Sequence, residues 1–135
     1  MIVIGIDPGT RTGVAVWATA EKTLLRVDSM RIDEAMALVL TAHESEQLHH
    51  VVYEDARLRK WLGAKGIEAL QGAGSIKRDC TIWAGFLGAH NIPSRAVAPQ
   101  AGATKWDAKH FERVTGWTGR TNEHGRDAAC LVYGV

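Results

Sequence analysis

The chain contains five short apolar runs, each bounded by turn residues. Their length and their content of Val, Ile and other apolar residues are typical of buried strands. They lie at residues 1–7, 13–17, 23–30, 51–54 and 95–97. Only short turns separate the first three runs, which are therefore predicted to form an antiparallel meander.

Elsewhere, apolar residues recur every three or four positions, the period of a helix with one buried face. Helices are predicted at about 32–47, from near Leu70 or Ser75 to Ala89, around 103–114, and from the favourable N-cap Asn122 onward. The predicted stripes are Ile32, Ala35, Met36, Val39 and His43; Ala73, Ile76, Cys80, Trp83 and Leu87; Ala103, Trp106, His110 and Val114; and His124, Asp127, Ala128 and Leu131. Residues 56–66 show no clean period and are predicted to be a mobile loop.

The order of elements is three strands, helix, strand, helix, strand, helix, helix. Strands reached through helical crossovers are expected to lie parallel to the first strand. The predicted fold is therefore an α/β sandwich, with a mixed sheet of three antiparallel and two parallel strands flanked by helices. At 135 residues, 46% of them hydrophobic, the chain is expected to form a single domain over 1–135.

The composition favours a soluble protein of the cytoplasm. No apolar stretch approaches the length of a membrane span, and the sequence opens on a strand-like run without a basic leader and cleavage site. Two cysteines, Cys80 and Cys130, lie in apolar, helix-like stretches and are expected to be reduced core residues.

The formal net charge of +1 conceals an uneven distribution. Residues 1–55 carry four Lys/Arg against nine Asp/Glu, whereas residues 56–126 carry twelve against five. This asymmetry favours a basic surface beside an acidic site, as expected where a polyanion is held over metal ions. The alternative is that the basic residues are scattered over solvated helix faces.

Two predicted strands end in carboxylates. Asp7 ends the first strand before Pro8-Gly9, and Gly13 in the next strand would let another backbone or a ligand approach closely. Taken alone, this segment could be a simple turn with an Asx hydrogen bond. Glu54 ends the fourth strand, which as a parallel neighbour would bring Glu54 to Asp7; Asp55 points the opposite way and is expected to be a turn, capping or outer residue.

A third acid lies in the last predicted helix. His124 and Asp127 are three residues apart and share a helix face, and the small Ala128 and Ala129 allow that helix to approach the sheet. Taken separately, each has an ordinary alternative: a surface histidine and a first-turn acid.

Three carboxylates and a histidine at one place would repel one another without cations. Oxygen ligands suit Mg²⁺ or Mn²⁺. Two such ions about 4 Å apart can activate water and stabilise the leaving 3′ oxygen in phosphodiester hydrolysis. The hypothesis assigns Asp7 to bridge the ions, Glu54 and Asp127 to hold one each, and His124 to coordinate or assist proton transfer.

These motifs resemble the RuvC family of Holliday-junction resolvases: an Ile-Asp-Pro-Gly first strand, an acid ending the fourth strand, and a carboxyl-terminal His-x-x-Asp-Ala helix. The resemblance implies an RNase H-like fold, a homodimer, and Mg²⁺-dependent nicking of four-way DNA junctions. The chain is shorter than typical bacterial members and resembles compact phage versions, whose range of branched substrates can be broader.

The resemblance also implies that the segment after the fourth strand and the next helix face DNA. The candidate DNA-binding residues there are Arg57, Arg59, Lys60, Trp61, Lys65, Lys77 and Arg78. Basic side chains would bind phosphates and Trp61 could stack on an unpaired base, or instead pack on the protein body. Lys105, Lys109 and Arg113 recur on one side of their predicted helix and could extend the track or equally form a solvated face. Trp83 and Trp106 are expected to be core or dimer contacts.

Three alternatives remain. The actin and sugar-kinase superfamily also opens on an Asp-containing turn, but its two large lobes exceed 135 residues. An RNase H-like nuclease acting on RNA, similar to the YqgF group, shares the opening strand. A non-catalytic nucleic-acid-binding module would not need all three acids.

Overall fold

The computed structural model describes residues 1–58, 66–99 and 105–135, and the side chains of all of these except 66–73. Within them lies a five-stranded sheet in the order β3-β2-β1-β4-β5. β1 pairs antiparallel with β2, and β2 with β3, whereas β4 lies parallel to β1 and β5 parallel to β4. The strands are β1 (Ile2–Asp7), β2 (Arg11–Ala18), β3 (Thr23–Arg31), β4 (Leu48–Glu54) and β5 (Ser94–Val97). The predicted meander and parallel strands are confirmed.

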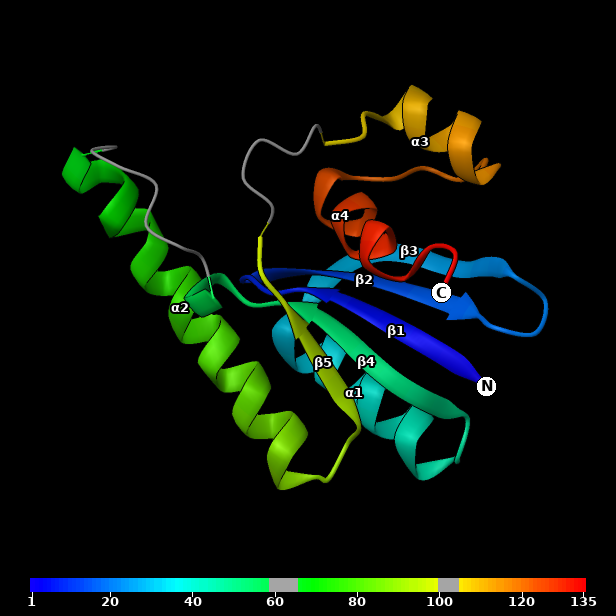
Figure 1. The fold of residues 1–135 in the computed structure, drawn as a ribbon, viewed down its shortest axis with the longest axis horizontal. Helices are drawn as coiled ribbons and strands as arrows, with labels where there is room; N and C mark the ends of the chain where they lie inside the picture. The colour runs from blue at the N-terminus through cyan, green and yellow to red at the C-terminus, as the bar shows by residue number, and fades with distance from the viewer. Residues whose placement is uncertain (59–65, 100–104) are drawn as a thin grey trace.

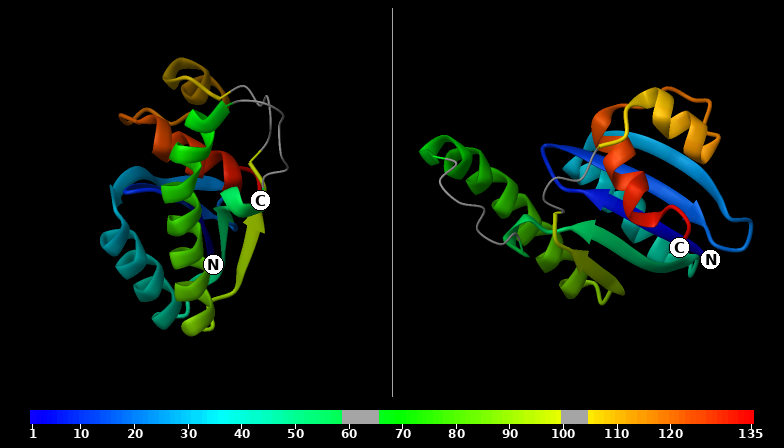
Figure 2. Two further views of the ribbon diagram at one scale, coloured as in Figure 1. Left: turned by 90° about the vertical axis from the view of Figure 1, so that its left-hand side faces the viewer. Right: turned by 45° about the horizontal axis from the view of Figure 1, so that its top comes forward.

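The helices cover both faces of the sheet (Figure 1, Figure 2). α1 and α2 pack on one face, and α4 packs on the other, beside α3. Their bounds are α1 (Ile32–Glu44), α2 (Gly66–Ala89), α3 (Ala108–Thr115) and α4 (Glu123–Val132), with a short 3-10 helix η1 (Ala56–Leu58) after β4. The predicted element order and α/β class are confirmed.

Alternation along the strands divides the core into two layers. In β1, Ile4 and Ile6 pack toward α1 and α2, whereas Val3 packs toward α4. In β4, Val51 belongs to the first layer and Val52 to the second. Since successive side chains of a strand point to opposite faces, this alternation also decides which face the polar residues at the strand ends present.

Several predicted boundaries shift. α1 ends at Glu44 and β4 already begins at Leu48, so the predicted helix was too long and the strand too short. α2 begins at Gly66, earlier than predicted, because its glycines weakened the helical pattern. Of its predicted stripe, Cys80, Trp83 and Leu87 are buried, but Ile76 is exposed and the Ala73 side chain lies outside the described ones.

The stripe predicted around 103–114 is wrong. Asp107 caps α3 by accepting a hydrogen bond from the His110 backbone N–H at 2.8 Å, so the helix begins after Trp106. Phe111 is its buried residue, and Val114 is exposed. Ala103 lies outside the described residues.

The two cysteines differ in environment. Both are free thiols, and Cys80 is buried as predicted. Cys130 is exposed, contrary to prediction, because α4 turns Ala128, Ala129 and Val132 toward the sheet and Cys130 away from it. The loop predicted at 56–66 begins with the 3-10 turn η1, and residues 59–65 lie outside the described ones. Among the described helices, none has the length and apolarity to cross a membrane.

Candidate active site

Two carboxylates meet at the carboxyl edge of the sheet because β1 and β4 run side by side in the same direction. Ile6 pairs with Tyr53 in the parallel ladder, so Asp7 and Glu54 come next on adjacent strands. Asp7 follows the alternation of Val3, and Glu54 that of Val52, which both face α4. Both acids therefore end their strands on the face that α4 covers.

A glycine lets α4 approach this edge. A Cβ at Gly13 would overlap the carbonyl oxygen of His124 and would lie 3.0 Å from the Asp7 Cβ. Gly5 plays the same part against the Ala128 carbonyl oxygen. The backbone of α4 thus packs directly on the backbone of the strands, as predicted for Gly13. This contact determines how close His124 and Asp127 lie to the sheet.

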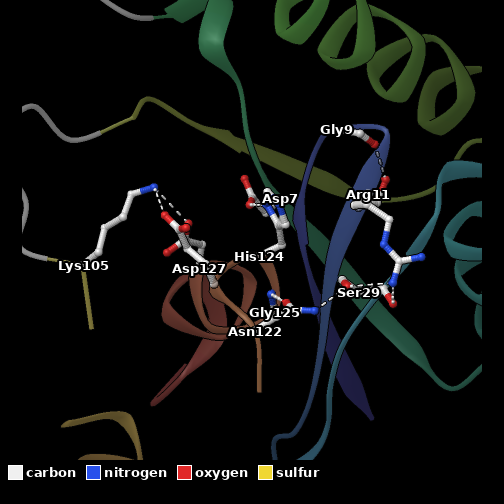
Figure 3. A network of polar contacts seen from close by, with 11 residues as sticks. Asp7, Gly9, Arg11, Ser29, Lys105, Asn122, His124, Gly125 and Asp127 are labelled. Carbon is white, nitrogen blue, oxygen red and sulfur yellow. Dashed lines mark hydrogen bonds and ion pairs between the residues drawn. The ribbon is translucent and has the colours of Figure 1, made fainter. Parts of the chain in front are cut away.

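A polar network fixes the beginning of α4 (Figure 3). Asn122 caps the helix by accepting a hydrogen bond from the Gly125 N–H at 2.9 Å, and its amide donates to the Ser29 hydroxyl of β3. Arg11 of β2 donates to the same Ser29 at 3.3 Å. The predicted N-cap is confirmed, and the helix end is tied to two strands by side chains.

Asp7 is the centre of the cluster. The His124 ring nitrogen Nδ1 lies 3.3 Å from Asp7 Oδ2. Burial, together with the negative charges of Glu54 and Asp127, raises the pKa of Asp7 to about 6, although the His124 contact opposes the shift. Carboxylates contributed by β1, β4 and α4 are thus close enough to repel one another, and the ionised cluster is short of positive charge.

Lys105 brings a positive charge to this cluster of carboxylates. Its Nζ donates to Asp127 Oδ2 at 3.2 Å and to Glu123 Oε1 at 3.1 Å, so the ammonium reaches over α4 (Figure 3). The Glu123 hydrogen bond, with support from Asp127, raises the pKa of Lys105. Lys105 precedes α3, so the assignment to a common face with Lys109 and Arg113 was wrong. No sequence spacing signals a contact over this separation.

The donor set is that of a hard divalent cation: three carboxylates, with one imidazole at the edge. In the part of the chain that the structure describes, no three acidic, histidine or cysteine side chains converge closely enough to hold a metal ion as they stand. The Lys105 ammonium occupies an Asp127 oxygen. The chemistry of the cluster fits Mg²⁺ or Mn²⁺, and a cation that binds at Asp127 Oδ2 would compete with the Lys105 ammonium for that oxygen.

Asp55 lies apart from this cluster. It is buried and accepts three hydrogen bonds from the Arg57 guanidinium, two from Nε at 2.9 and 3.2 Å and one from Nη2 at 2.7 Å, and a further one from the Arg57 backbone N–H at 3.0 Å. The hydrogen bonds from the Arg57 side chain are the main reason why the pKa of Asp55 lies below its usual range. Asp55 therefore caps η1, in agreement with the role expected of it.

The thiol of Cys80 steadies the same turn from α2. Its Sγ accepts from the Ala56 N–H at 3.4 Å and lies 3.6 Å from the Glu54 carbonyl oxygen, to which it can donate. A buried cysteine of α2 thus holds the backbone on both sides of Asp55, directly after Glu54. The sequence predicts Cys80 only as a core residue.

The candidate DNA-binding residues are only partly described. Arg57 is engaged with Asp55, so two of its guanidinium nitrogens are already used. Lys77 is exposed on α2, as is Arg78, whose guanidinium lies 3.7 Å from Asp79. Arg59, Lys60, Trp61 and Lys65 lie outside the described residues. Trp83 is a core residue as expected, and Trp106 packs at the edge of the core beside α3.

Comparison with known proteins supports the assignment of the fold. No protein-family model matches the sequence, and no curated protein matches it. Among solved structures, it is similar to Thermus thermophilus RuvC, a structure in complex with Holliday junction substrate. The TM-score is 0.58 at 20% sequence identity, and the match covers 97% of this chain and 90% of that one. This chain therefore has the RNase H-like α/β fold of RuvC, with its mixed sheet of three antiparallel and two parallel strands.

Proposed function

We propose that the protein is a RuvC-like endonuclease that nicks Holliday junctions and other branched DNA in a reaction dependent on Mg²⁺ or Mn²⁺. The observation that carries the proposal is Asp7. It ends the central strand of an RNase H-like sheet, contacts His124, and has a pKa raised to about 6 by burial and by Glu54 and Asp127. A carboxyl with a strongly raised pKa, beside other acids at the carboxyl edge of a sheet, favours a catalytic site.

Each residue has a part in the proposed reaction. Asp7, Glu54 and Asp127 would hold two divalent cations, with His124 beside Asp7. The cations would supply an activated water and stabilise the charge on the leaving oxygen. The Asp7 carboxylate orients the His124 ring, whose nitrogen can accept or return a proton beside the carboxylates. The close packing of α4 on Gly5 and Gly13 would hold His124 and Asp127 in position beside Asp7.

Paired nicks in opposite strands of a junction require two such sites. We therefore infer that the working form is a homodimer that acts on DNA in the cytoplasm. The similarity to RuvC supports this inference at the level of the fold.

A panel of labelled substrates tests the function. Purified protein with Mg²⁺ is given a four-way junction, a three-way junction, linear duplex DNA and an RNA–DNA hybrid, each with an EDTA control. We expect paired, symmetric nicks on branched DNA and none in EDTA, with a dimer mass by light scattering. Cleavage that persists in EDTA contradicts the metal mechanism. Preference for the hybrid or structured RNA indicates an RNA nuclease, and binding without cleavage of any substrate indicates a non-catalytic module.

Replacing Lys105 with methionine is expected to raise the affinity of the DNA-free protein for Mn²⁺. The Lys105 ammonium competes with a cation for Asp127 Oδ2, and an exposed ion pair is worth up to about 1 kcal/mol, which corresponds to roughly a two- to fivefold gain. Isothermal titration with Mn²⁺ measures the change.

Lys109→Met is the matched control for this measurement. It removes the same charge from α3, and among the described ion pairs Asp127 is paired with Lys105 and not with Lys109. Unchanged or weaker Mn²⁺ binding in Lys105→Met would show that the Lys105 contact does not oppose the cation.

A further inference from the structure

A pocket beside the carboxylate cluster has no role in the function proposed so far. It has a volume of about 350 Å³ and is lined, among the described residues, by Lys105, Trp106, Asp107, His110 and Arg113. A second hollow, lined by Asp107, Lys109, Glu112 and Arg113, shares two of these residues. We call the first one the α3 pocket. Ligand pockets span roughly 300 to 1,000 Å³, so this one has room for a single small group.

The α3 pocket adjoins the cluster through Lys105. This residue lines the pocket and also donates to Asp127 Oδ2 at 3.2 Å. One lysine side chain and its hydrogen bond therefore connect the pocket to Asp127. A strand whose phosphodiester lies over Asp7 and Asp127 would have its neighbouring nucleotide within reach of the pocket.

The lining combines an aromatic ring with positive charge. Trp106 is partly buried, and its ring centroid lies 6.2 Å from that of Phe111 and 6.4 Å from that of Tyr133. Arg126 Nε donates a hydrogen bond to the backbone carbonyl oxygen of Trp106 at 3.0 Å. Contacts to both its side chain and its backbone therefore fix the position of Trp106. The His110 ring lies 5.4 Å from the indole in an edge-to-face arrangement.

Arg113 is the group in the pocket that can bind an anion. The Asp107 carboxylate accepts the capping hydrogen bond from the His110 N–H, and the Lys105 ammonium is already paired with Glu123 and Asp127. The exposed Arg113 guanidinium lines the same pocket and can donate to a phosphate. An aromatic side chain that can stack on a base and a guanidinium that can bind a phosphate are two features by which proteins hold single-stranded nucleic acid.

We propose that the α3 pocket receives the nucleotide adjacent to the cleaved phosphodiester, with its base on Trp106 and its phosphate on Arg113. This proposal rests on the proposed nuclease function and extends it. It gives the branched substrate a reason to be selected, because a nucleotide can enter the pocket only where it is unpaired or easily unstacked.

The test uses branched DNA with the fluorescent base 2-aminopurine on either side of the mapped nick. Asp7→Asn protein is first assayed for cleavage and then serves as the cleavage-deficient background for binding with Mg²⁺. We expect 2-aminopurine fluorescence to fall on binding at one flanking position. Trp106→Leu in that background should abolish the fall and weaken binding roughly tenfold.

Arg113→Gln provides a second, exposed variant that does not depend on core packing. It should weaken DNA binding several-fold and make the dependence of log affinity on log salt shallower by about one unit. Lys22→Gln, which removes the same charge from the turn between β2 and β3, is the matched control and should change the salt dependence less.

The outcomes separate the two proposals. If the fluorescence change persists in Trp106→Leu, or is lost instead in Trp61→Leu, the pocket assignment is wrong while the nuclease stands. If free deoxyadenosine monophosphate binds as tightly as DNA and displaces it, the pocket serves a free nucleotide and the strand assignment is wrong. If Asp7→Asn still cleaves, or wild-type protein neither binds nor cuts branched DNA, the proposed function fails first and the pocket assignment falls with it.

Discussion

Asp7→Asn is expected to abolish metal-dependent cleavage and, at the same time, to stabilise the metal-free protein at pH 8. If Asp7 holds the proposed cations, loss of its carboxylate should reduce the cleavage rate by roughly a thousandfold or more, because metal stabilisation of the transition state is worth several kcal/mol. Single-turnover cleavage of a four-way junction measures this loss.

The gain in stability follows from the raised pKa of Asp7. The native carboxyl keeps its proton up to about pH 6, whereas in the unfolded chain it loses the proton near 3.8. Between these values the native state binds more protons than the unfolded state, so wild-type stability falls as the pH rises through the window and stays lower above it. Asparagine carries no charge, and the variant should therefore be more stable above pH 6 by about 1 to 3 kcal/mol.

Urea unfolding in EDTA at pH 4 and pH 8 measures this difference, which should be absent at pH 4. Asp33→Asn is the control: Asp33 is an exposed carboxylate whose pKa is lowered by its hydrogen bond to Arg31, so its replacement should give no gain at pH 8. Equal stability of Asp7→Asn and wild type at pH 8 would mean that the carboxylates do not repel one another in the metal-free protein.

The second large effect is expected at Gly13. A methyl group there would overlap the His124 carbonyl oxygen and press on the Asp7 Cβ, so α4 must move away from β2. Gly13→Ala should lower the free energy of unfolding by roughly 2 to 4 kcal/mol, in the upper range for overpacked positions, and should also reduce cleavage because His124 and Asp127 move with the helix.

Gly85→Ala is the matched control for Gly13. Gly85 lies within α2, and a Cβ there meets nothing within 4 Å. Alanine should therefore stabilise the protein by about 0.5 to 1 kcal/mol through helix propensity alone. Thermal and urea unfolding of both variants measure the change in the free energy of unfolding, which should be negative for Gly13→Ala and positive for Gly85→Ala. Wild-type stability and cleavage in Gly13→Ala would rule out the close contact between β2 and α4.

The sequence predicts the features that depend on local chemistry or on the two-residue alternation of strands. Asp7 and Glu54 end apolar runs, and parallel pairing of β1 with β4 makes them neighbours at one edge, as expected. Asn122 precedes a helix, and its side chain caps that helix. Gly13 permits the backbone contact for which only glycine has room.

Other parts of the site depend on contacts that no spacing signals. Lys105 contacts Asp127 although α3 separates the two residues in the sequence. Cys80 of α2 stabilises the turn after Glu54 by weak sulfur hydrogen bonds. At α3 two local signals conflicted: an apolar stripe through Trp106 suggested an earlier start, whereas the Asp107 cap fixed the start after it. Capping prevailed because it satisfies a backbone donor that the stripe would leave unpaired.

The packing of α4 on Gly5 and Gly13 also means that the cluster depends on the docking of a single helix. Asp7 and Glu54 end the paired strands β1 and β4, whereas His124 and Asp127 belong to α4, which follows all five strands in the chain. A chain with a complete sheet but a detached α4 would therefore bring together only two of the four side chains. Local opening of this one helix would dismantle the cluster while the strands stay paired.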